Sequence, residues 1–124
     1  MSERDWLFRL EDILECARRV VTYAARLDRD AFAANRMATD AIVHNLLIMG
    51  EAASRMPDDA RLRLAHLPWQ QMRGMRNRLI HDYPSVDLDI VWETVCSDIP
   101  ALIPHLEAAI AGERDRRDRI KNDS

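Results

Sequence analysis

The chain has 124 residues, carries a formal net charge of −3, and is 48% hydrophobic and 31% charged. This length fits one domain, and the apolar fraction is large enough for a core, so a disordered chain is excluded. Only three glycines interrupt the chain, and its many Ala, Leu and Arg residues favour helices.

The cysteines and the chain ends indicate a cellular compartment. Cys16 and Cys96 form no CxxC pattern, which excludes a disulfide scaffold and the usual cysteine zinc sites. We expect both to pack as small core residues in a reducing cytosol. The N-terminus has no signal-peptide character, and no apolar run approaches the roughly 20 residues of a membrane span. We therefore expect a soluble, cytoplasmic protein.

The small net charge conceals a basic block followed by an acidic block. Between Asp59 and Asp82 there are five arginines and no acidic residue, whereas from Asp82 to Glu113 there are seven acidic residues and no Lys or Arg. A basic block can bind a polyanion locally despite the overall sign of the charge. The two blocks can equally be solvated faces of different helices, and charge alone leaves both readings open.

The first half of the chain predicts two long helices. Over residues 4–27 the apolar residues recur in steps of three and four, which indicates an amphipathic helix. Residues 28–35 are interpreted as a connection. Residues 37–56 predict a second helix that is apolar over most of its surface and therefore central in the fold.

The second half predicts one short and two long helices. A short helix starts after Pro57 and runs to about residue 64, and Pro68 opens a long helix over residues 69–80. Pro84 ends that region and disfavours helical angles at Tyr83. The acidic residues Asp87 and Asp89 suit the start of the last helix. Its apolar stripe comprises Leu88, Val91, Val95, Ile99, Leu102, Leu106 and Ile110.

The last predicted helix contains prolines and is followed by a polar tail. We expect a kink or break at Pro100 and Pro104. Residues 1–112 are predicted to form the single domain, and residues 113–124 a frayed tail. The pattern as a whole predicts an all-α fold, an antiparallel bundle of four to five helices.

Arg76 interrupts the apolar seam of the helix over residues 69–80. Such an arginine needs a carboxylate, backbone carbonyls or a phosphate as partner. His81 follows five residues later, roughly 140° away around an ideal helix. The two converge on one phosphate only if the helix loosens or a second subunit closes the cleft. Asn77 is four residues before His81, so its amide is positioned to bond the imidazole, and the Tyr83 hydroxyl is expected to project from the helix end.

These residue types suit metal-free RNA cleavage, in which the 2′-hydroxyl attacks the adjacent phosphate. A histidine near neutral pKa moves the proton, and an arginine stabilises charge on the phosphate oxygens. Arg73 and Arg78 flank the motif and are candidates for RNA phosphate contacts. Spacing alone also fits a histidine and an arginine with structural roles.

Polar residues on the predicted second helix form one further candidate site. Asp40, His44, Glu51 and Arg55 fall on one face at helical spacing. A metal site there lacks a Glu-x-x-His pair and ligands from a second helix, so we predict a solvated or interface face and no metal. Glu51 lies in an apolar stretch, and we expect it to pair with an arginine of the cleft.

At these residues the chain resembles the HEPN superfamily and, within it, the HepT-like toxins. The family motif R-x4-H-x-Y is matched by Arg76, His81 and Tyr83, with the polar Asn77 after the arginine. Pro84 follows the tyrosine, where many relatives carry an aromatic residue. Surrounding matches are Ile48-Met49-Gly50-Glu51-Ala52, Pro68-Trp69, Gly74-Met75-Arg76-Asn77, and Val86-Asp87-Leu88 with Val91-Trp92.

The resemblance implies a HEPN bundle that works as a homodimer, with both R-x4-H-x-Y segments lining one interface cleft. It implies a metal-independent endoribonuclease without a cofactor, acting on tRNA or mRNA, with Arg76 and His81 catalytic and Asn77 supporting. It also implies a minimal nucleotidyltransferase antitoxin that inactivates the toxin by AMPylation of Tyr83. Two alternatives stay open: a non-catalytic HEPN module that binds nucleotide or the transferase, and a purely structural bundle.

Overall fold

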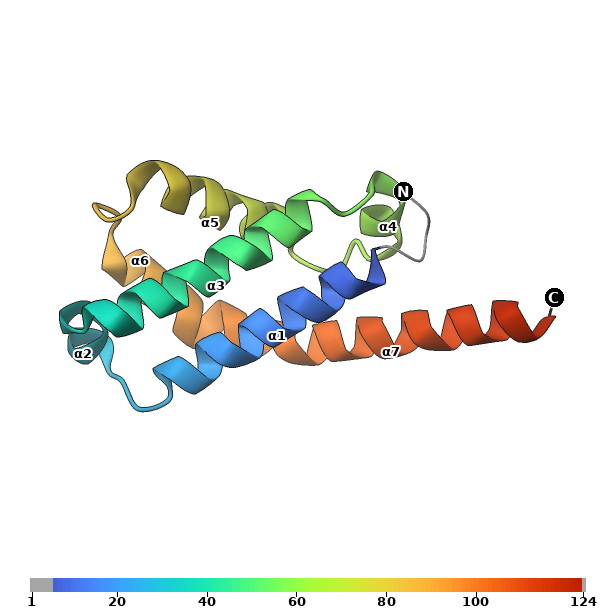
Figure 1. Ribbon diagram of the computed structural model, residues 1–124, viewed down its shortest axis with the longest axis horizontal. Coiled ribbons are helices and arrows are strands. Elements are labelled where there is room, and N and C mark those ends of the chain that lie inside the picture. The colour runs from blue at the N-terminus through green and yellow to red at the C-terminus, as the bar shows by residue number, and fades with distance from the viewer. Residues whose placement is uncertain (1–5, 124) are drawn as a thin grey trace.

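The computed structural model describes residues 6–123, and every regular element in this range is a helix. Four long helices, α1 (Leu7–Ala24), α3 (Arg36–Ser54), α5 (Trp69–Asp82) and α7 (Ile99–Asp123), run antiparallel to their neighbours (Figure 1). α3 packs against α1 and α5, and α1 packs against α7, so the order across the bundle is α5–α3–α1–α7. The predicted all-α bundle is confirmed. None of the helices of this range has the length and apolar character needed to cross a membrane.

The central position predicted for the second long helix is confirmed in α3. Both flanks of α3 are covered by other helices, and its buried side chains include Ile42, Leu46 and Met49. The apolar stripe predicted for the first helix is buried as well, although its expected start at residue 4 lies outside the described residues. Burial of these stripes is the main favourable term that holds the helices together.

The segment interpreted as a connection contains a short helix, α2 (Arg29–Ala34), so that prediction is wrong. The Asp28 side chain caps α2 by accepting a hydrogen bond from the Ala31 N–H. Asn35 ends α2 and caps α3. Phe32 is fully buried and its ring stacks on Trp92, with 5.0 Å between centroids. A helix as short as α2 depends on its capping residue and on tertiary packing for its stability. The spacing of apolar residues in the sequence does not reveal either contribution.

Residues 88–123, here called the C-terminal limb, are helical throughout, and the predicted helix start near Asp87 is confirmed. α6 (Leu88–Glu93) is capped by Asp87 and leads into a π-helical turn, η2 (Thr94–Asp98), which continues directly into α7. The ring of Pro100 would clash with the carbonyl of the residue four earlier in a regular helix. The π-helical turn η2 lies directly before Pro100, and in it the Ile99 N–H donates to the carbonyl of Thr94, five residues earlier instead of four. The expectation was a kink or break at Pro100 and Pro104: at Pro100 the helix changes pitch and does not break, and α7 continues through Pro104. α4 (Asp58–Arg63) matches the predicted short helix.

The polar residues after Gly112 continue α7 as far as Asp123, instead of ending helical order at residue 112 as expected. Glu113 is buried and forms ion pairs with Arg63 of α4 and with Arg117 one turn later on α7. Both guanidinium groups lie over the buried ring of Trp6. Although burial opposes it, hydrogen bonds from Arg63 and Arg117 hold the pKa of Glu113 below its ordinary value. This charged cluster ties the extended helix to the bundle.

The two cysteines differ in their surroundings. Cys16 is buried on α1, as expected, whereas Cys96 is exposed. The prediction that Cys96 is a core residue is therefore wrong. Cys96 belongs to the π-helical turn, where the core positions are taken by Val95 and the adjacent Ile99.

Gly50 sets how closely α3 and α5 approach each other. A Cβ at this position would lie 2.2 Å from the Cβ of Arg76 and 2.8 Å from the carbonyl oxygen of Met72. Neither atom is the free end of a flexible side chain, so a larger residue requires the helices to separate. Glycine is needed here for space, and no unusual backbone angle is involved.

We expect Gly50→Ala to lower the free energy of unfolding by about 1–3 kcal/mol, because overpacking displaces α5. Chemical denaturation monitored by circular dichroism measures this change. Gly112→Ala is the matched control, since nothing lies within 4 Å of a Cβ there. In the control, alanine should be neutral or should stabilise α7 by about 0.5–1 kcal/mol. A Gly50→Ala protein as stable as the wild type would contradict the assigned role.

Candidate functional site

Arg76 lies on α5 against α3 and is held by two side chains. Its Nη2 is 2.9 Å from Oε2 of Glu51, and its Nη1 donates a 3.0 Å hydrogen bond to Oδ1 of Asn77. The expected pairing of Glu51 with an arginine is therefore present. The expected hydrogen bond between Asn77 and His81 is absent from the described residues, and Asn77 instead orients Arg76. With 31% of its side chain exposed, the guanidinium is fixed in place and accessible to a ligand.

Glu51 is the anion that fixes Arg76. A hydrogen bond from Arg55, 2.7 Å long, and the charge of Arg76 both lower the pKa of Glu51 from its ordinary value. Glu51 is therefore ionised at neutral pH, so it serves as an electrostatic anchor for Arg76 and not as a proton donor. Its position on α3, one residue after the close helix contact at Gly50, brings it to the arginine.

His81 lies on α5 but not in the Arg76 cluster. α5 stays helical through Asp82, one residue beyond the histidine, so the roughly 140° separation from Arg76 persists. The His81 side chain is exposed and lines a shallow concavity together with Arg78, Tyr83 and Asp87 among other residues. The loosening of the helix that would let Arg76 and His81 converge on one chain is therefore absent from α5.

Tyr83 turns back toward α3 instead of projecting from the helix end. Its backbone is extended, as predicted for the residue before a proline, but its hydroxyl donates a hydrogen bond to Oδ1 of Asp40. Arg36 is 3.2 Å from the same carboxylate, and its guanidinium lies 5.6 Å from the centroid of the Tyr83 ring. Burial and the hydrogen bond to Asp40 raise the pKa of Tyr83. The motif tyrosine is therefore half-buried, and its hydroxyl is hydrogen-bonded within the chain.

The polar stripe of α3 thus has assigned partners. Glu51 pairs with Arg76 and is itself paired with Arg55. Asp40, which accepts the hydrogen bond from Tyr83, lies about 16 Å away from Glu51 along α3. His44 is exposed between them. Within residues 6–123 no three potential metal-ligating side chains come together. Two residues of the stripe therefore contact the motif segment: Glu51 pairs with Arg76, as expected, and Asp40 accepts from Tyr83, which the helical spacing alone did not reveal.

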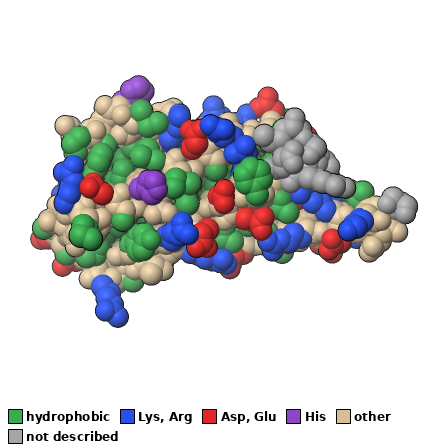
Figure 2. All heavy atoms as spheres, in the orientation of Figure 1, with side chains coloured by type: hydrophobic (Ala, Val, Ile, Leu, Met, Phe, Trp, Pro, Cys, Tyr) green, Lys and Arg blue, Asp and Glu red, His purple; other side chains and the backbone are tan. Residues whose placement is uncertain are grey.

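The two arginines predicted to contact RNA lie on different sides of α5. Arg73 faces α4 and Arg78 faces the C-terminal limb, as the surface hollows they line show. In the part of the chain that the structure describes, neither forms an ion pair, whereas Arg61 pairs with Asp58. Elsewhere acidic and basic side chains are intermixed, as one face shows (Figure 2). Arg73 and Arg78 therefore keep their charge available for a ligand.

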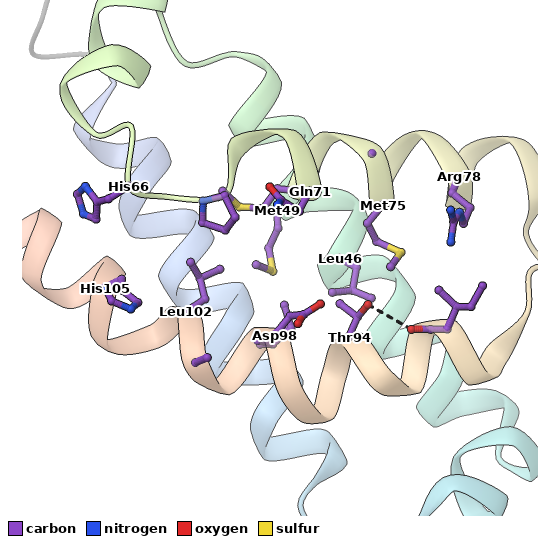
Figure 3. Close-up of a pocket in the computed structure, with 16 residues that line it drawn as sticks. Leu46, Met49, His66, Gln71, Met75, Arg78, Thr94, Asp98, Leu102 and His105 are labelled. Carbon is purple, nitrogen blue, oxygen red and sulfur yellow. Dashed lines mark hydrogen bonds between the residues drawn. The ribbon is translucent and has the colours of Figure 1, made fainter.

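A cavity of about 790 Å³ lies between α5 and the segment formed by α6, η2 and the start of α7 (Figure 3). Leu46 and Met49 of α3 form its apolar floor, Met75 lines it from α5, and Leu102 lines it from α7. Arg78 extends into it from α5. This side of α5 differs from the side that holds Arg76, so the motif helix carries two distinct surfaces.

Sequence reasoning missed Arg36 and the role of Asp40. The two residues are four apart on α3, a spacing at which opposite charges pair, and that was the available signal. The link from Asp40 to Tyr83 spans 43 positions. No local pattern encodes such a contact, because it depends on how α5 docks on α3.

Comparison with known proteins identifies the family of this chain. Residues 13–109 match the family model described as ribonuclease HepT-like. A Methanocaldococcus jannaschii protein named "Putative RNase" is 36% identical over 107 residues, covering 86% of this chain and 98% of that protein. A Thermococcus cleftensis protein named "Probable ribonuclease HepT" is 34% identical over 101 residues, covering 82% and 89%. No solved structure matches significantly.

The match covers α3 and α5 completely, so it includes the close contact at Gly50, the Arg76 cluster, His81 and Tyr83. The relatives align over nearly their whole lengths. On these grounds the chain belongs to the ribonuclease HepT-like family of the HEPN superfamily.

Proposed function

We propose that this chain is a metal-independent endoribonuclease and the toxin of a toxin–antitoxin pair. The observation that carries the proposal is the family match over residues 13–109, within which Arg76 is fixed by Glu51 and Asn77 yet accessible. The names of the relatives describe RNases. The substrate class that follows is RNA, since the 2′-hydroxyl supplies the nucleophile.

Each site residue has a role in this reaction. His81 takes the proton of the 2′-hydroxyl as its oxygen attacks the adjacent phosphorus. The bond from phosphorus to the 5′-oxygen breaks, and that oxygen takes a proton from water, which leaves a cyclic phosphate and a 5′-hydroxyl end. Arg76 stabilises the charge that develops on the phosphate oxygens. Arg73 and Arg78, which have no ion pairs within residues 6–123, position the RNA backbone.

We expect purified protein to cleave tRNA or mRNA in the presence of EDTA. His81→Ala should reduce the rate by about 10²–10⁴-fold, the usual contribution of a general acid–base residue. His105→Ala is the matched control: His105 is also exposed but lies on α7 outside the motif, so its loss should leave the rate unchanged. The measurement is a time course of cleavage of labelled RNA.

Two outcomes would overturn the ribonuclease proposal. One is a wild-type protein, free of modification, that cleaves no RNA. The other is cleavage that stops when divalent ions are chelated. A stable complex with a nucleotidyltransferase in the absence of any cleavage would favour the non-catalytic binding module.

The catalytic site is proposed to form in a homodimer. Because α5 is a regular helix through Asp82, Arg76 and His81 of one chain point in directions roughly 140° apart. The apolar side chain of Ile80 lies on the face between them and is 52% exposed. A second copy that covers this face would bring its own motif to the same cleft.

This arrangement predicts complementation between two inactive variants. A heterodimer of one Arg76→Ala chain and one His81→Ala chain keeps one Arg76 and one His81, on different subunits. If the cleft is shared, the purified heterodimer should cleave RNA well above either variant homodimer. Differently tagged chains allow its isolation after co-expression. A heterodimer as inactive as its parents, or a wild-type chain that sediments as a monomer, would contradict the shared cleft.

The antitoxin is proposed to be a minimal nucleotidyltransferase that AMPylates Tyr83. Support comes from the position of this tyrosine, two residues after His81, where an added nucleotide would obstruct the cleft. After co-expression with a minimal nucleotidyltransferase antitoxin, intact-mass and peptide mass spectrometry should find one adenylyl group on Tyr83. The Tyr83→Phe chain should stay unmodified. A neutralised toxin whose Tyr83 carries no adenylyl group would refute this part of the proposal.

A further inference from the structure

The Tyr83 hydroxyl already has a proton acceptor within this chain. It donates its hydrogen bond to Oδ1 of Asp40, which stands on the first turns of α3. Asp40 is 53% exposed and ion-paired with Arg36 at 3.2 Å. Arg36 and Asp40 both lie at the start of α3. Two contacts hold the backbone there: Asn35 caps the helix, and the Thr39 hydroxyl donates to the Phe32 carbonyl. Asp40 is therefore a positioned, ionic acceptor and not a side chain that meets the tyrosine by chance.

A tyrosine phenol needs such an acceptor to react. Its ordinary pKa is near 10, so at neutral pH the weakly nucleophilic neutral form prevails. Burial and the contact with Asp40 raise the pKa of Tyr83 further, so a free phenolate is scarcer still. Reaction at this oxygen then requires that a base remove the proton as the new bond forms.

We propose that Asp40 is the general base for adenylyl transfer to Tyr83, an inference that rests on the modification proposed above. The phenol oxygen forms a bond to the α-phosphorus of ATP, the bond from that phosphorus to the bridging oxygen breaks, and pyrophosphate leaves. The phenol proton passes to the Asp40 carboxylate. The toxin thus supplies the general base for the reaction that inactivates it.

Arg36 completes the arrangement as a positioning residue. Its ion pair holds the Asp40 carboxylate, and its guanidinium lies over the Tyr83 ring. With 69% of its side chain exposed, Arg36 faces the solvent from which a nucleotide arrives. A cation at this place attracts the negatively charged α-phosphate toward the phenol oxygen.

The test uses Asp40→Asn, because the amide oxygen still accepts the phenol hydrogen bond but no longer acts as a base. With purified toxin, transferase and ATP, modification of Tyr83 followed by mass spectrometry should slow by about 10²–10⁴-fold. Asp40→Glu keeps a carboxylate and should recover part of the rate. Asp115→Asn is the matched control. It also removes a carboxylate that is paired with an arginine four residues away in sequence, but Asp115 lies near the end of α7, so this variant should be modified at the wild-type rate.

A titration of the phenol checks the contact independently of the transferase. Burial and the charge of Asp40 raise the pKa of Tyr83, whereas the charge of Arg36 lowers it. Asp40→Asn should therefore lower this pKa, measured by ultraviolet difference absorbance with the Tyr83→Phe chain subtracted to remove Tyr23. An unchanged pKa would show that Asp40 does not contact the phenol in solution.

The outcomes separate this inference from the proposal on which it rests. If the wild-type Tyr83 accepts no adenylyl group, the proposed modification and the role of Asp40 both fall. If the wild type and Asp40→Asn are modified at equal rates, the modification stands and the role of Asp40 alone is overturned. Slow reaction of Asp40→Asn with an unchanged melting temperature supports the inference.

Discussion

The contact between α3 and α5 at Gly50 is the constraint on which the candidate site depends. The missing side chain lets the Arg76 backbone come so close to α3 that a Cβ at residue 50 would overlap that of Arg76. Glu51 follows directly in sequence and is therefore in reach of the guanidinium. The same docking brings the end of α5 near the start of α3, where Tyr83 meets Asp40. The close approach of α3 and α5 therefore makes possible both the contacts around Arg76 and those around Tyr83.

The two clusters differ in their electrostatics, and this difference matches their proposed roles. Around Arg76 a lowered pKa keeps Glu51 anionic, so the arginine is oriented without losing its exposure. Around Tyr83 the phenol is kept neutral and bound to a carboxylate. The first arrangement suits stabilisation of an incoming phosphate, and the second suits a hydroxyl that reacts only when a base removes its proton.

Regularity of α5 has a consequence for assembly. Because the helix does not unwind before His81, the arginine and histidine of the motif diverge on one chain. The apolar cavity and the exposed Ile80 lie on further faces of the same helix. α5 therefore has α3 as its one extensive partner among the described helices, and its other faces stay uncovered by the described part of the chain.

The sequence by itself determined the long helices and the motif. Periodic apolar residues defined α1, α3, α5 and the stripe of the C-terminal limb, since burial of one face follows directly from spacing. It also indicated that Arg76 needs a partner and that Glu51 was available. Tertiary structure alone decided the rest: the α2 turn held by Phe32, the helix beyond Gly112 anchored through Glu113, and the hydrogen bond from Tyr83 to Asp40. These features depend on contacts between residues far apart in sequence, which no local pattern records.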